Sequence, residues 1–213
     1  MTGRSDLHEL EAPMPEDASP DSLSPDSLPA RYFDDMYEVH QDPWNFETSP
    51  YEAGKYDRTL AALPNGRYVS ALEVGCSIGV LTARLAPRCT QLLSLDLSQR
   101  ALDRARARCA SLPQVRFERR QMPAEFPPGR FDLLVLSEVL YYLSPADLQL
   151  MLERSVGALL PAGHLIAVHW TPAVHDYPQT GDQVHAALLA APGLKHLYGE
   201  RHEQYRLDLF ERS

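Results

Sequence analysis

"ALEVGCSIGVLTARLAP" (residues 71–87) opens with an apolar run, continues through a loop that contains two glycines and ends with residues at helical spacing. This order predicts a buried strand, a tight turn and a helix. Backbone N–H groups at the start of a helix have no intrahelical partners, so such a turn is typical of sites that bind nucleotides. The stretch therefore predicts a ligand site at the end of a buried strand.

The loop in this stretch, G-C-S-I-G, matches neither of the two best-known phosphate-binding patterns. The dinucleotide fingerprint G-x-G-x-x-G needs glycine at 75, 77 and 80, where the sequence has Gly75, Ser77 and Val80. A P-loop needs a lysine after the loop, and none follows it. The pattern present is E-x-G-x-S-x-G, beginning at Glu73, in which Gly75 permits the turn and Gly79 lets a ligand approach the helix.

An acidic residue follows at the distance expected of a ribose partner. The next predicted strand ends at Asp96, 21 residues after Gly75. A carboxylate in this position can accept two hydrogen bonds from a ribose diol. Since the pyrophosphate pattern is absent, we expect a ligand that contains a ribose and lacks a diphosphate.

Apolar runs alternate with helical patterns along the rest of the chain. Strands are predicted at 70–74, 92–96, 115–119, 131–137 and 164–170, and helices at 79–86, 98–111, 145–159 and 181–190. Two last strands, at 194–201 and 204–211, have the short connection of an antiparallel hairpin. We therefore expect a Rossmann-like, doubly wound α/β fold with a mostly parallel seven-stranded sheet and an antiparallel edge strand. Ligands of such sheets bind at the carboxyl ends of the strands.

The chain divides into three predicted regions. Residues 1–29 are acidic and rich in proline and serine, with the tandem repeat SPDSL at 19–28, so we expect a disordered tail. Residues 30–66 are aromatic-rich with helical spacing and predict a helical cap or lid. Its helices are expected at 31–40 and from Ser49, an N-cap followed by Pro50. Residues 67–213 form the predicted ligand-binding core.

Charge and cysteine usage exclude several classes of protein. The net charge is −9, of which −6 falls in residues 1–29, and this argues against a protein that binds nucleic acid. No apolar run reaches the roughly 18 to 20 residues that span a bilayer, and no signal peptide is expected. Cys76, Cys89 and Cys109 fit neither a zinc site nor a disulfide framework, so we expect a cytoplasmic protein without a membrane or nucleic-acid partner. No feature predicts the oligomeric state.

The loop and the acid after it resemble class I S-adenosyl-L-methionine-dependent methyltransferases. In that family the loop cradles the methionine part of the cofactor, the acid holds the ribose, and an acid after the third strand binds the adenine. Gln121 stands at the adenine position here, with Met122 beside it. The resemblance implies that the chain binds S-adenosyl-L-methionine and releases S-adenosyl-L-homocysteine. It implies cofactor contacts from the following residues: Glu73, Gly75, Cys76, Ser77, Gly79, Asp96, Leu97, Gln121, Met122 and Ser137.

Further stretches are similar to the NodS-type methyltransferases. They are "DPWNFETSPYEAGKY" (42–56), "FDLLVLSEVLYYL" (131–143) and "DYPQTGDQVH" (176–185). The group is named for a nodulation protein that N-methylates the free amine of a deacetylated chitin oligosaccharide. The resemblance, which covers roughly residues 31–211, implies an N-methyltransferase for an amino sugar and a role in oligosaccharide biosynthesis.

Aromatic side chains of the predicted cap can stabilise a sulfonium by cation–π attraction. We expect Trp44 and Tyr51 to contact the cofactor, within a cluster that also contains Tyr37, Phe46 and Tyr56. The alternative is that these rings only anchor a cap helix to the sheet. Glu52 and Lys55 can face either the cofactor or the solvent.

The residues after the fourth strand are the candidates for catalysis. Glu138, with Tyr141 nearby, can orient an acceptor ammonium and accept its proton; alternatively it is a carboxylate stabilised at a helix start. His169 is a second candidate base. His185 and Asp182 share a helix face, although Thr180 or Asp182 can equally be a helix cap. The histidine spacing has no metal signature, so no metal site is predicted.

Three other functions remain open at this stage. The same fold can methylate oxygen or carbon of another small metabolite. A Rossmann-type nicotinamide oxidoreductase is disfavoured by the missing glycine at position 80. A cofactor-binding protein without catalysis is disfavoured by the polar segment after the fourth strand.

Overall fold

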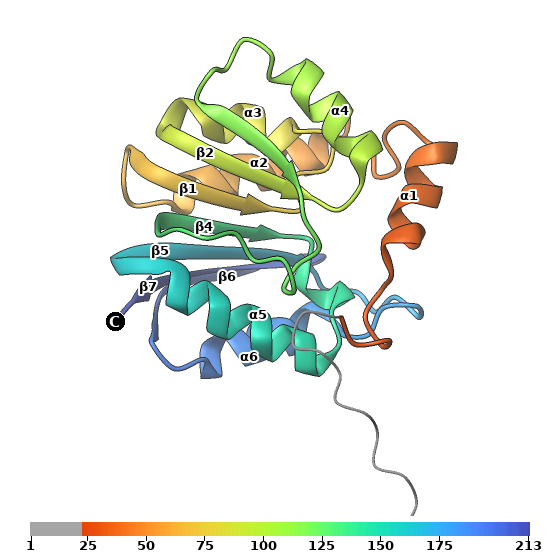
Figure 1. Ribbon diagram of the computed structural model, residues 1–213. Coiled ribbons are helices and arrows are strands. Elements are labelled where there is room, and N and C mark those ends of the chain that lie inside the picture. Colours follow the sequence, from red (N-terminus) through yellow and green to blue (C-terminus); the bar gives the residue numbers. More distant parts are fainter. Residues whose placement is uncertain (1–22) are drawn as a thin grey trace, which may run out of the picture.

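The computed structural model describes residues 23–213, which form a seven-stranded sheet in the order β3-β2-β1-β4-β5-β7-β6 (Figure 1). The pairs that join β1, β2, β3, β4 and β5 are all parallel, and β7 runs antiparallel between β5 and β6. This confirms the predicted doubly wound fold with an antiparallel edge hairpin. The strands are β1 (Tyr68–Val74), β2 (Cys89–Asp96), β3 (Val115–Arg119), β4 (Phe131–Ser137), β5 (Leu159–Trp170), β6 (Leu194–Arg201) and β7 (Tyr205–Arg212).

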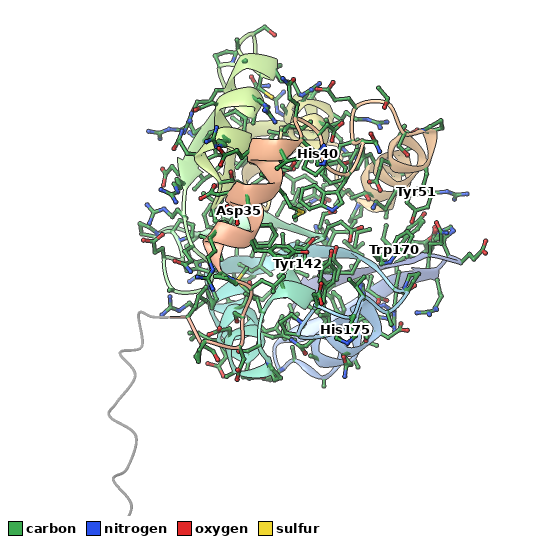
Figure 2. The ribbon with its side chains drawn as sticks, turned by 90° about the vertical axis from the view of Figure 1, so that its right-hand side faces the viewer. Asp35, His40, Tyr51, Tyr142, Trp170 and His175 are labelled. Carbon is green, nitrogen blue, oxygen red and sulfur yellow. The ribbon has the colours of Figure 1, made fainter. Side chains whose placement is uncertain are left out.

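The strand order reverses between β1 and β4. The chain proceeds from β1 outward to β2 and β3 and then returns to β4 on the other side of β1. A crevice forms at the carboxyl ends of strands where the order reverses in this way. Helix α1 (Ala30–Val39) lies across this end of the sheet (Figures 1 and 2).

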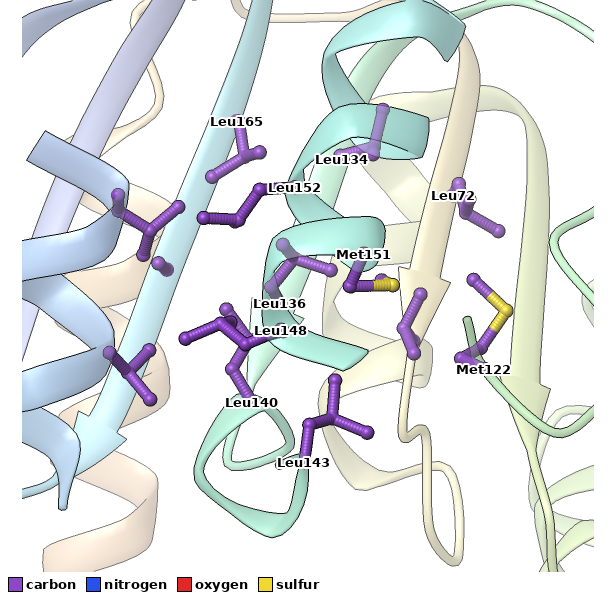
Figure 3. Close-up of a cluster of buried hydrophobic side chains, with 14 of the residues drawn as sticks. Leu72, Met122, Leu134, Leu136, Leu140, Leu143, Leu148, Met151, Leu152 and Leu165 are labelled. Atoms are coloured by element: carbon purple, nitrogen blue, oxygen red, sulfur yellow. The ribbon is translucent and has the colours of Figure 1, made fainter. Parts of the chain in front are cut away.

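Helices cover both faces of the sheet because alternate strand residues point to opposite sides. Leu134 and Leu136 pack with the helices α5 (Pro145–Ala158) and α6 (Gly181–Ala190) (Figure 3). Leu133 and Val135 pack on the other face, beside α2 (Pro50–Ala62) and α3 (Val80–Leu85). The remaining helices are α4 (Gln99–Arg108), beside β2 and β3, and the short 3₁₀ turns η1 (Ala86–Arg88) and η2 (Leu140–Tyr142).

The predicted cap region contains two helices with different positions. Helix α2 begins after Ser49, whose side chain accepts a hydrogen bond from the Glu52 N–H, as the sequence predicts. Tyr56 and Leu63, in and just after α2, belong to the cluster on the sheet face. Helix α1 therefore covers the end of the sheet, whereas α2 packs on its face and brings only its first turns to that end.

The prediction of a disordered tail over residues 1–29 is wrong for its last part, residues 23–29. Residues 1–22 lie outside the described part of the chain, whereas residues 23–29 are held against the turn before α5. The Ser27 hydroxyl donates to Asp147 Oδ2 at 2.5 Å and accepts from the Ser144 N–H at 2.7 Å. The Leu28 N–H donates to the Tyr142 carbonyl at 2.9 Å. These partners are more than 100 residues away, so the composition of the segment could not reveal them.

Between residues 23 and 213, no helix has both the length and the apolar character that crossing a bilayer requires.

Candidate active site

A cavity of about 470 Å³ lies at the carboxyl ends of β1, β2 and β4. Its volume is in the range of small-molecule and cofactor sites. Figure 2 looks onto this end of the molecule, with α1 in front and with Tyr51 and Trp170 at one rim. Most of the predicted site residues line the cavity: Trp44, Tyr51, Glu73, Gly75, Cys76, Ser77, Asp96, Leu97, Met122, Ser137, Glu138 and Tyr141.

The glycine loop approaches the segment after β4 very closely. Gly75 has a φ of +77°, and a Cβ at this position would lie 2.1 Å from Val139 Cγ1. The N–H groups of Gly75 and Cys76 both donate to the Leu95 carbonyl, at 2.8 and 2.9 Å. Glycine is therefore required at 75 for two reasons: its positive φ, and the close contact between the loop after β1 and the segment after β4.

Ser77 connects the loop to two other elements. It has a φ of +50°, and its N–H donates to Asp96 Oδ2 at 2.8 Å. Its hydroxyl shares a short hydrogen bond with the hydroxyl of Tyr37 on α1. Ser77 thus joins the loop, the end of β2 and the cap helix, a role that a second glycine would not supply.

The Asp96 carboxylate is held by backbone donors on both oxygens. The Ser98 N–H donates to Oδ1 at 2.9 Å, and Ser77 occupies Oδ2. Burial raises the pKa of Asp96 to about 6, against the opposing effect of these backbone hydrogen bonds. Each oxygen keeps a further lone pair. Asp96 is therefore oriented toward the cavity and can accept hydrogen bonds from a diol.

Glu73 lies behind the loop and braces it. Only 2% of the residue is exposed, and its Oε2 accepts hydrogen bonds from Thr82 Oγ1 at 2.6 Å and Ser94 Oγ at 2.7 Å. Burial raises the pKa of Glu73 to about 7, and the two hydroxyl donors oppose that rise. Glu73 links β1 to α3 and β2 and so fixes the loop between them.

Two predicted cofactor contacts are not in the cavity wall. Gly79 has a φ of +80°, and a Cβ there would lie 3.0 Å from Ala105. Glycine at 79 therefore allows the close packing of α4. Gln121 also lies outside the wall; its N–H donates to Glu125 Oε2 at 2.7 Å, and the neighbouring Arg120 and Met122 line the cavity instead.

Glu138 receives hydrogen bonds from three parts of the fold. Its Oε1 lies 2.5 Å from Lys55 Nζ, and its Oε2 accepts from the Tyr141 hydroxyl at 2.6 Å and from the Trp170 N–H at 2.9 Å. Its φ of +56° aims the side chain toward these partners. The carboxylate is thus held by an ion pair and two hydrogen bonds, in place of the helix-start alternative that the sequence allowed.

Lys55 is a buried cation between two carboxylates. It is 3% exposed, and its Nζ donates to Glu52 Oε1 at 3.0 Å as well as to Glu138. The same Nζ lies 5.4 Å from the centre of the Tyr51 ring. Burial alone would lower the pKa of Lys55, but the charges of Glu138 and Glu52 outweigh it and raise the pKa. Lys55 is therefore charged, and it ties α2 to the segment after β4.

His169 does not fit the predicted role of a base. Its Nε2 accepts from the Leu140 N–H at 3.2 Å, and its Nδ1 lies 3.1 Å from His185 Nε2. Since the backbone group can only donate, Nδ1 carries the ring proton. The ring is fully buried and outside the cavity wall, and burial lowers its pKa well below the usual range. Both nitrogens are occupied, so His169 positions the turn at Leu140.

His185 does not pair with Asp182, the residue that shares its helix face. His185 Nδ1 lies 2.6 Å from Asp208 Oδ2 on β7, while Asp182 forms an ion pair with Arg201. Asp208 further accepts from His196 Nε2 and Arg206 Nε, both at 2.7 Å. Spacing along α6 suggested a local pair, but the partner comes from the adjacent strand.

Several cavity residues were not among the predicted site residues: Leu23, Leu28, Phe33, Tyr37, Glu52, Lys55, Arg120, Val174, Tyr177 and Gln204. A signal for Glu52 and Lys55 was present, because opposite charges three residues apart after a capped helix start can share one face. No sequence signal connects Leu23 and Leu28 to the cavity, since they lie within the acidic, proline-rich segment.

The doubly wound sheet, the E-x-G-x-S-x-G loop and the carboxylate that ends β2 are together typical of the class I S-adenosylmethionine-dependent methyltransferases. The family model described as Nodulation protein S (NodS) matches residues 35–173, more than half of the chain. The chain belongs to the NodS family.

Comparisons with individual proteins agree with this family. Nodulation protein S from Rhizobium tropici is 36% identical over 130 residues, which cover 59% of this chain and 53% of that protein. Trans-aconitate 2-methyltransferase from Deinococcus radiodurans is 36% identical over 117 residues, or 55% of this chain and 43% of that protein. The chain thus spans about half the length of these curated relatives.

A solved structure extends the similarity over nearly all of the fold. N-methyltransferase NodS from Bradyrhizobium japonicum WM9, in complex with S-adenosyl-L-homocysteine, has a TM-score of 0.78 and 25% sequence identity. The match covers 86% of this chain and 98% of that chain.

Proposed function

We propose that the protein transfers a methyl group from S-adenosyl-L-methionine to the free amine of a small acceptor, with a deacetylated amino sugar or oligosaccharide as the first candidate. One observation carries the proposal. A single cavity joins the glycine loop and Asp96, at one end, to the carboxylates of Glu52 and Glu138 at the other. A donor site and a site for a cationic acceptor are therefore continuous.

The residues at the loop end fit S-adenosyl-L-methionine. Asp96 would hold the ribose diol, and the segment from Gly75 to Ser77 would hold the methionine part. Leu97 and Met122 supply apolar walls for the adenine. When bound, the cofactor supplies a methyl group already activated by a positively charged sulfur.

Aromatic rings close this end of the cavity. Trp44 stacks on Phe46 with ring centres 5.5 Å apart, and Tyr37 contacts Trp44 edge to face at 5.7 Å. The negative faces of aromatic rings favour a sulfonium nearby. The proposed contribution of this chain is mainly to position the reactants and to exclude water.

The charge of the other end favours an amine as the acceptor. Glu52 and Glu138 outnumber the single cation Lys55, so this wall has an excess of one negative charge. An amine must lose a proton before it attacks, and a carboxylate can orient the ammonium and accept that proton. The same wall repels an anionic acceptor, which argues against a carboxylic acid as the substrate, although one relative is a trans-aconitate methyltransferase.

The direct test is transfer of labelled methyl from S-adenosyl-L-methionine to a glucosamine tetramer. The fully N-acetylated tetramer is the matched control because it has the same sugar chain and no free amine. We expect label in the glucosamine tetramer alone. Equal labelling of both sugars would support methylation of oxygen, the principal alternative, and labelling of neither would contradict the amino-sugar acceptor.

The methyl donor is tested separately through stability. S-adenosyl-L-homocysteine should raise the melting temperature of the protein because a ligand that binds only the folded state stabilises it. NAD should leave the melting temperature unchanged. The reverse result would assign the site to a nicotinamide oxidoreductase.

The proposed location is the cytoplasm. Cys76, Cys89 and Cys109 are all buried and free, which is typical of a protein in a reducing compartment. The acceptor is proposed to be a soluble metabolite, with neither a nucleic acid nor a membrane as a partner.

A further inference from the structure

The partners of Glu138 make it a poor base for the acceptor amine. Its two oxygens already accept hydrogen bonds from Lys55, Tyr141 and Trp170. A proton added to this carboxylate would neutralise the anion that the buried Lys55 ammonium lies against at 2.5 Å. Glu52, the other carboxylate partner of Lys55, lies farther away at 3.0 Å, so Lys55 would lose its closer counter-ion, which is unfavourable for a buried cation. Proton transfer to Glu138 would therefore disrupt the wall of the site.

Glu52 has fewer side-chain partners than Glu138, because Lys55 is the only group among residues 23–213 that donates to its carboxylate. Its Oε1 accepts from Lys55 Nζ at 3.0 Å. Its Oε2 lies 3.0 Å from the same Nζ as part of the ion pair, and this buried oxygen accepts no hydrogen bond from the described residues. Glu52 lines the cavity, and 8% of the residue is exposed. Buried polar atoms almost always have a hydrogen-bond partner, so a buried carboxylate oxygen that accepts none, on a residue of the cavity wall, points to a ligand that donates to it.

The residue before Glu52 has a second unpaired polar atom. The Tyr51 hydroxyl is buried without a hydrogen-bond partner, and Tyr51 also lines the cavity. Its ring is fixed by edge-to-face contacts with Trp170 and Tyr205, both with centres 6.1 Å away. An ammonium carries three donors and can serve both the Tyr51 hydroxyl and Glu52 Oε2.

Burial gives Glu52 the proton affinity that a base needs. Desolvation raises its pKa, while the charge of Lys55 opposes that rise. Ser49, which accepts from the Glu52 N–H, fixes the first turn of α2 and with it the direction of the side chain. Glu52 thus combines an oxygen that accepts no hydrogen bond, a fixed position in the cavity wall and a raised pKa.

We propose that Glu52, not Glu138, accepts the proton of the acceptor ammonium, and that the Tyr51 hydroxyl completes the ammonium site. This assignment rests on the proposed amine methylation. The N–H bond breaks, a bond from the proton to Glu52 Oε2 forms, and the nitrogen keeps the electron pair. That pair forms the C–N bond as the C–S bond of the donor breaks. Glu138 and Lys55 are positioning residues that hold Glu52 at the cavity.

The kinetic test compares Glu52→Gln with Glu138→Gln, using the glucosamine tetramer as the acceptor and saturating S-adenosyl-L-methionine. Glu52→Gln should lower kcat by about 100-fold or more, the range typical of a lost general base. The acid side of its pH–rate profile should also disappear, since that limb reports the protonation of Glu52. Glu138→Gln should lower the melting temperature and raise KM while the acid limb persists. A Glu52→Gln variant that keeps its kcat and its acid limb would overturn the assignment.

A binding measurement tests the ammonium site without turnover. In the presence of S-adenosyl-L-homocysteine, calorimetry with the glucosamine tetramer should show about tenfold or greater loss of affinity in Glu52→Gln, as expected for a lost charge-assisted hydrogen bond. Tyr51→Phe should lose a few-fold. Glu47→Gln is the matched control, because Glu47 lies in the same region, pairs with Arg108 and is outside the cavity wall. It should bind like the wild type.

The two proposals fail in different ways. If the wild type binds the tetramer without methylating it, amine methylation is contradicted, and the calorimetry still decides the ammonium site. If the wild type methylates the tetramer and Glu52→Gln matches it in both assays, only the role of Glu52 is overturned. Absence of binding to the wild type would overturn both.

Discussion

Two buried polar clusters lie on either side of the segment that follows β4, and they differ in one respect. The cap cluster consists of Tyr51, Glu52, Lys55 and Glu138; it lines the cavity and leaves two buried oxygens without hydrogen bonds. The histidine chain consists of His169, His185 and Asp208, lies outside the cavity wall and has a partner for every side-chain nitrogen and oxygen.

This difference is the basis for our proposal that the first cluster is a ligand site and the second a structural element. A buried network with a hydrogen bond for every polar atom stabilises one conformation, whereas buried atoms without hydrogen bonds beside a cavity are candidates for binding a ligand. Changes in the histidine chain should therefore affect stability first, and changes at the cavity should affect binding or turnover first.

The largest expected effect is on stability. Asp208→Asn replaces a buried acceptor of three hydrogen bonds, from His185, His196 and Arg206, and should lower the free energy of unfolding by about 3–5 kcal/mol. Denaturant unfolding measures this change. His196→Gln removes only the partly exposed donor and serves as the control. Equal losses in the two variants would show that the buried contacts of Asp208 contribute no more to stability than its contact with the partly exposed His196.

The next effect concerns the cavity. Asp96→Ala removes the carboxylate expected to hold the ribose diol and should weaken binding of S-adenosyl-L-homocysteine by about 10- to 100-fold. Calorimetry measures the affinity, and circular dichroism should show a folded protein. Unchanged affinity would remove Asp96 from the ribose role.

The histidine chain should also make stability depend on pH. His169 has a pKa well below its unfolded value because burial and the neighbouring His185 disfavour its charged form. The unfolded chain therefore binds a proton at this site below about pH 6.5 that the folded chain does not, so the contribution of His169 to stability falls as the pH drops from there. This contribution should approach about 1.4 kcal/mol per pH unit and opposes those of Glu73 and Asp96, whose raised pKa values favour the folded state in the same range. His169→Gln should remove the contribution and shift the slope of stability against pH accordingly, and an unchanged slope would contradict this role of His169.

The smallest effect is expected where the cap helix meets the loop. Tyr37→Phe removes the hydroxyl that hydrogen-bonds Ser77 and leaves the ring in place. Affinity for S-adenosyl-L-homocysteine should fall only a few-fold, in line with about 1 kcal/mol for one hydrogen bond. A loss as large as that of Asp96→Ala would mean that the cap contact, and not the β2 carboxylate, dominates binding.

Local sequence patterns predicted most of the fold. The strands at 115–119, 131–137 and 194–201 and the helix at 181–190 have the predicted bounds, because apolar periodicity and turn residues are local signals. Strand β5 begins at Leu159, earlier than the predicted 164, because its first residues are more exposed and lack a clear apolar pattern.

Contacts between distant residues were less predictable. Asp96 was predicted as a ribose partner from its separation from the loop in the sequence. The pairing of Lys55 with Glu138, in contrast, spans 83 residues and has no local signal. Gly79 has a further contact of this kind, because a Cβ there would lie 3.0 Å from Ala105 on another helix, which the loop motif alone does not reveal. Tertiary packing decides which motif residues reach the site.

The most direct test of the contrast between the two clusters is to measure melting temperature and kcat together for Glu52→Gln and Asp208→Asn, with the glucosamine tetramer as acceptor. Glu52→Gln should lose kcat by about 100-fold while its melting temperature changes by less than about 4 °C. Asp208→Asn should lose more than about 6 °C and retain most of its kcat below its melting range. Full turnover in Glu52→Gln, together with a large fall in its melting temperature, would show that the cap cluster is structural and would contradict the account.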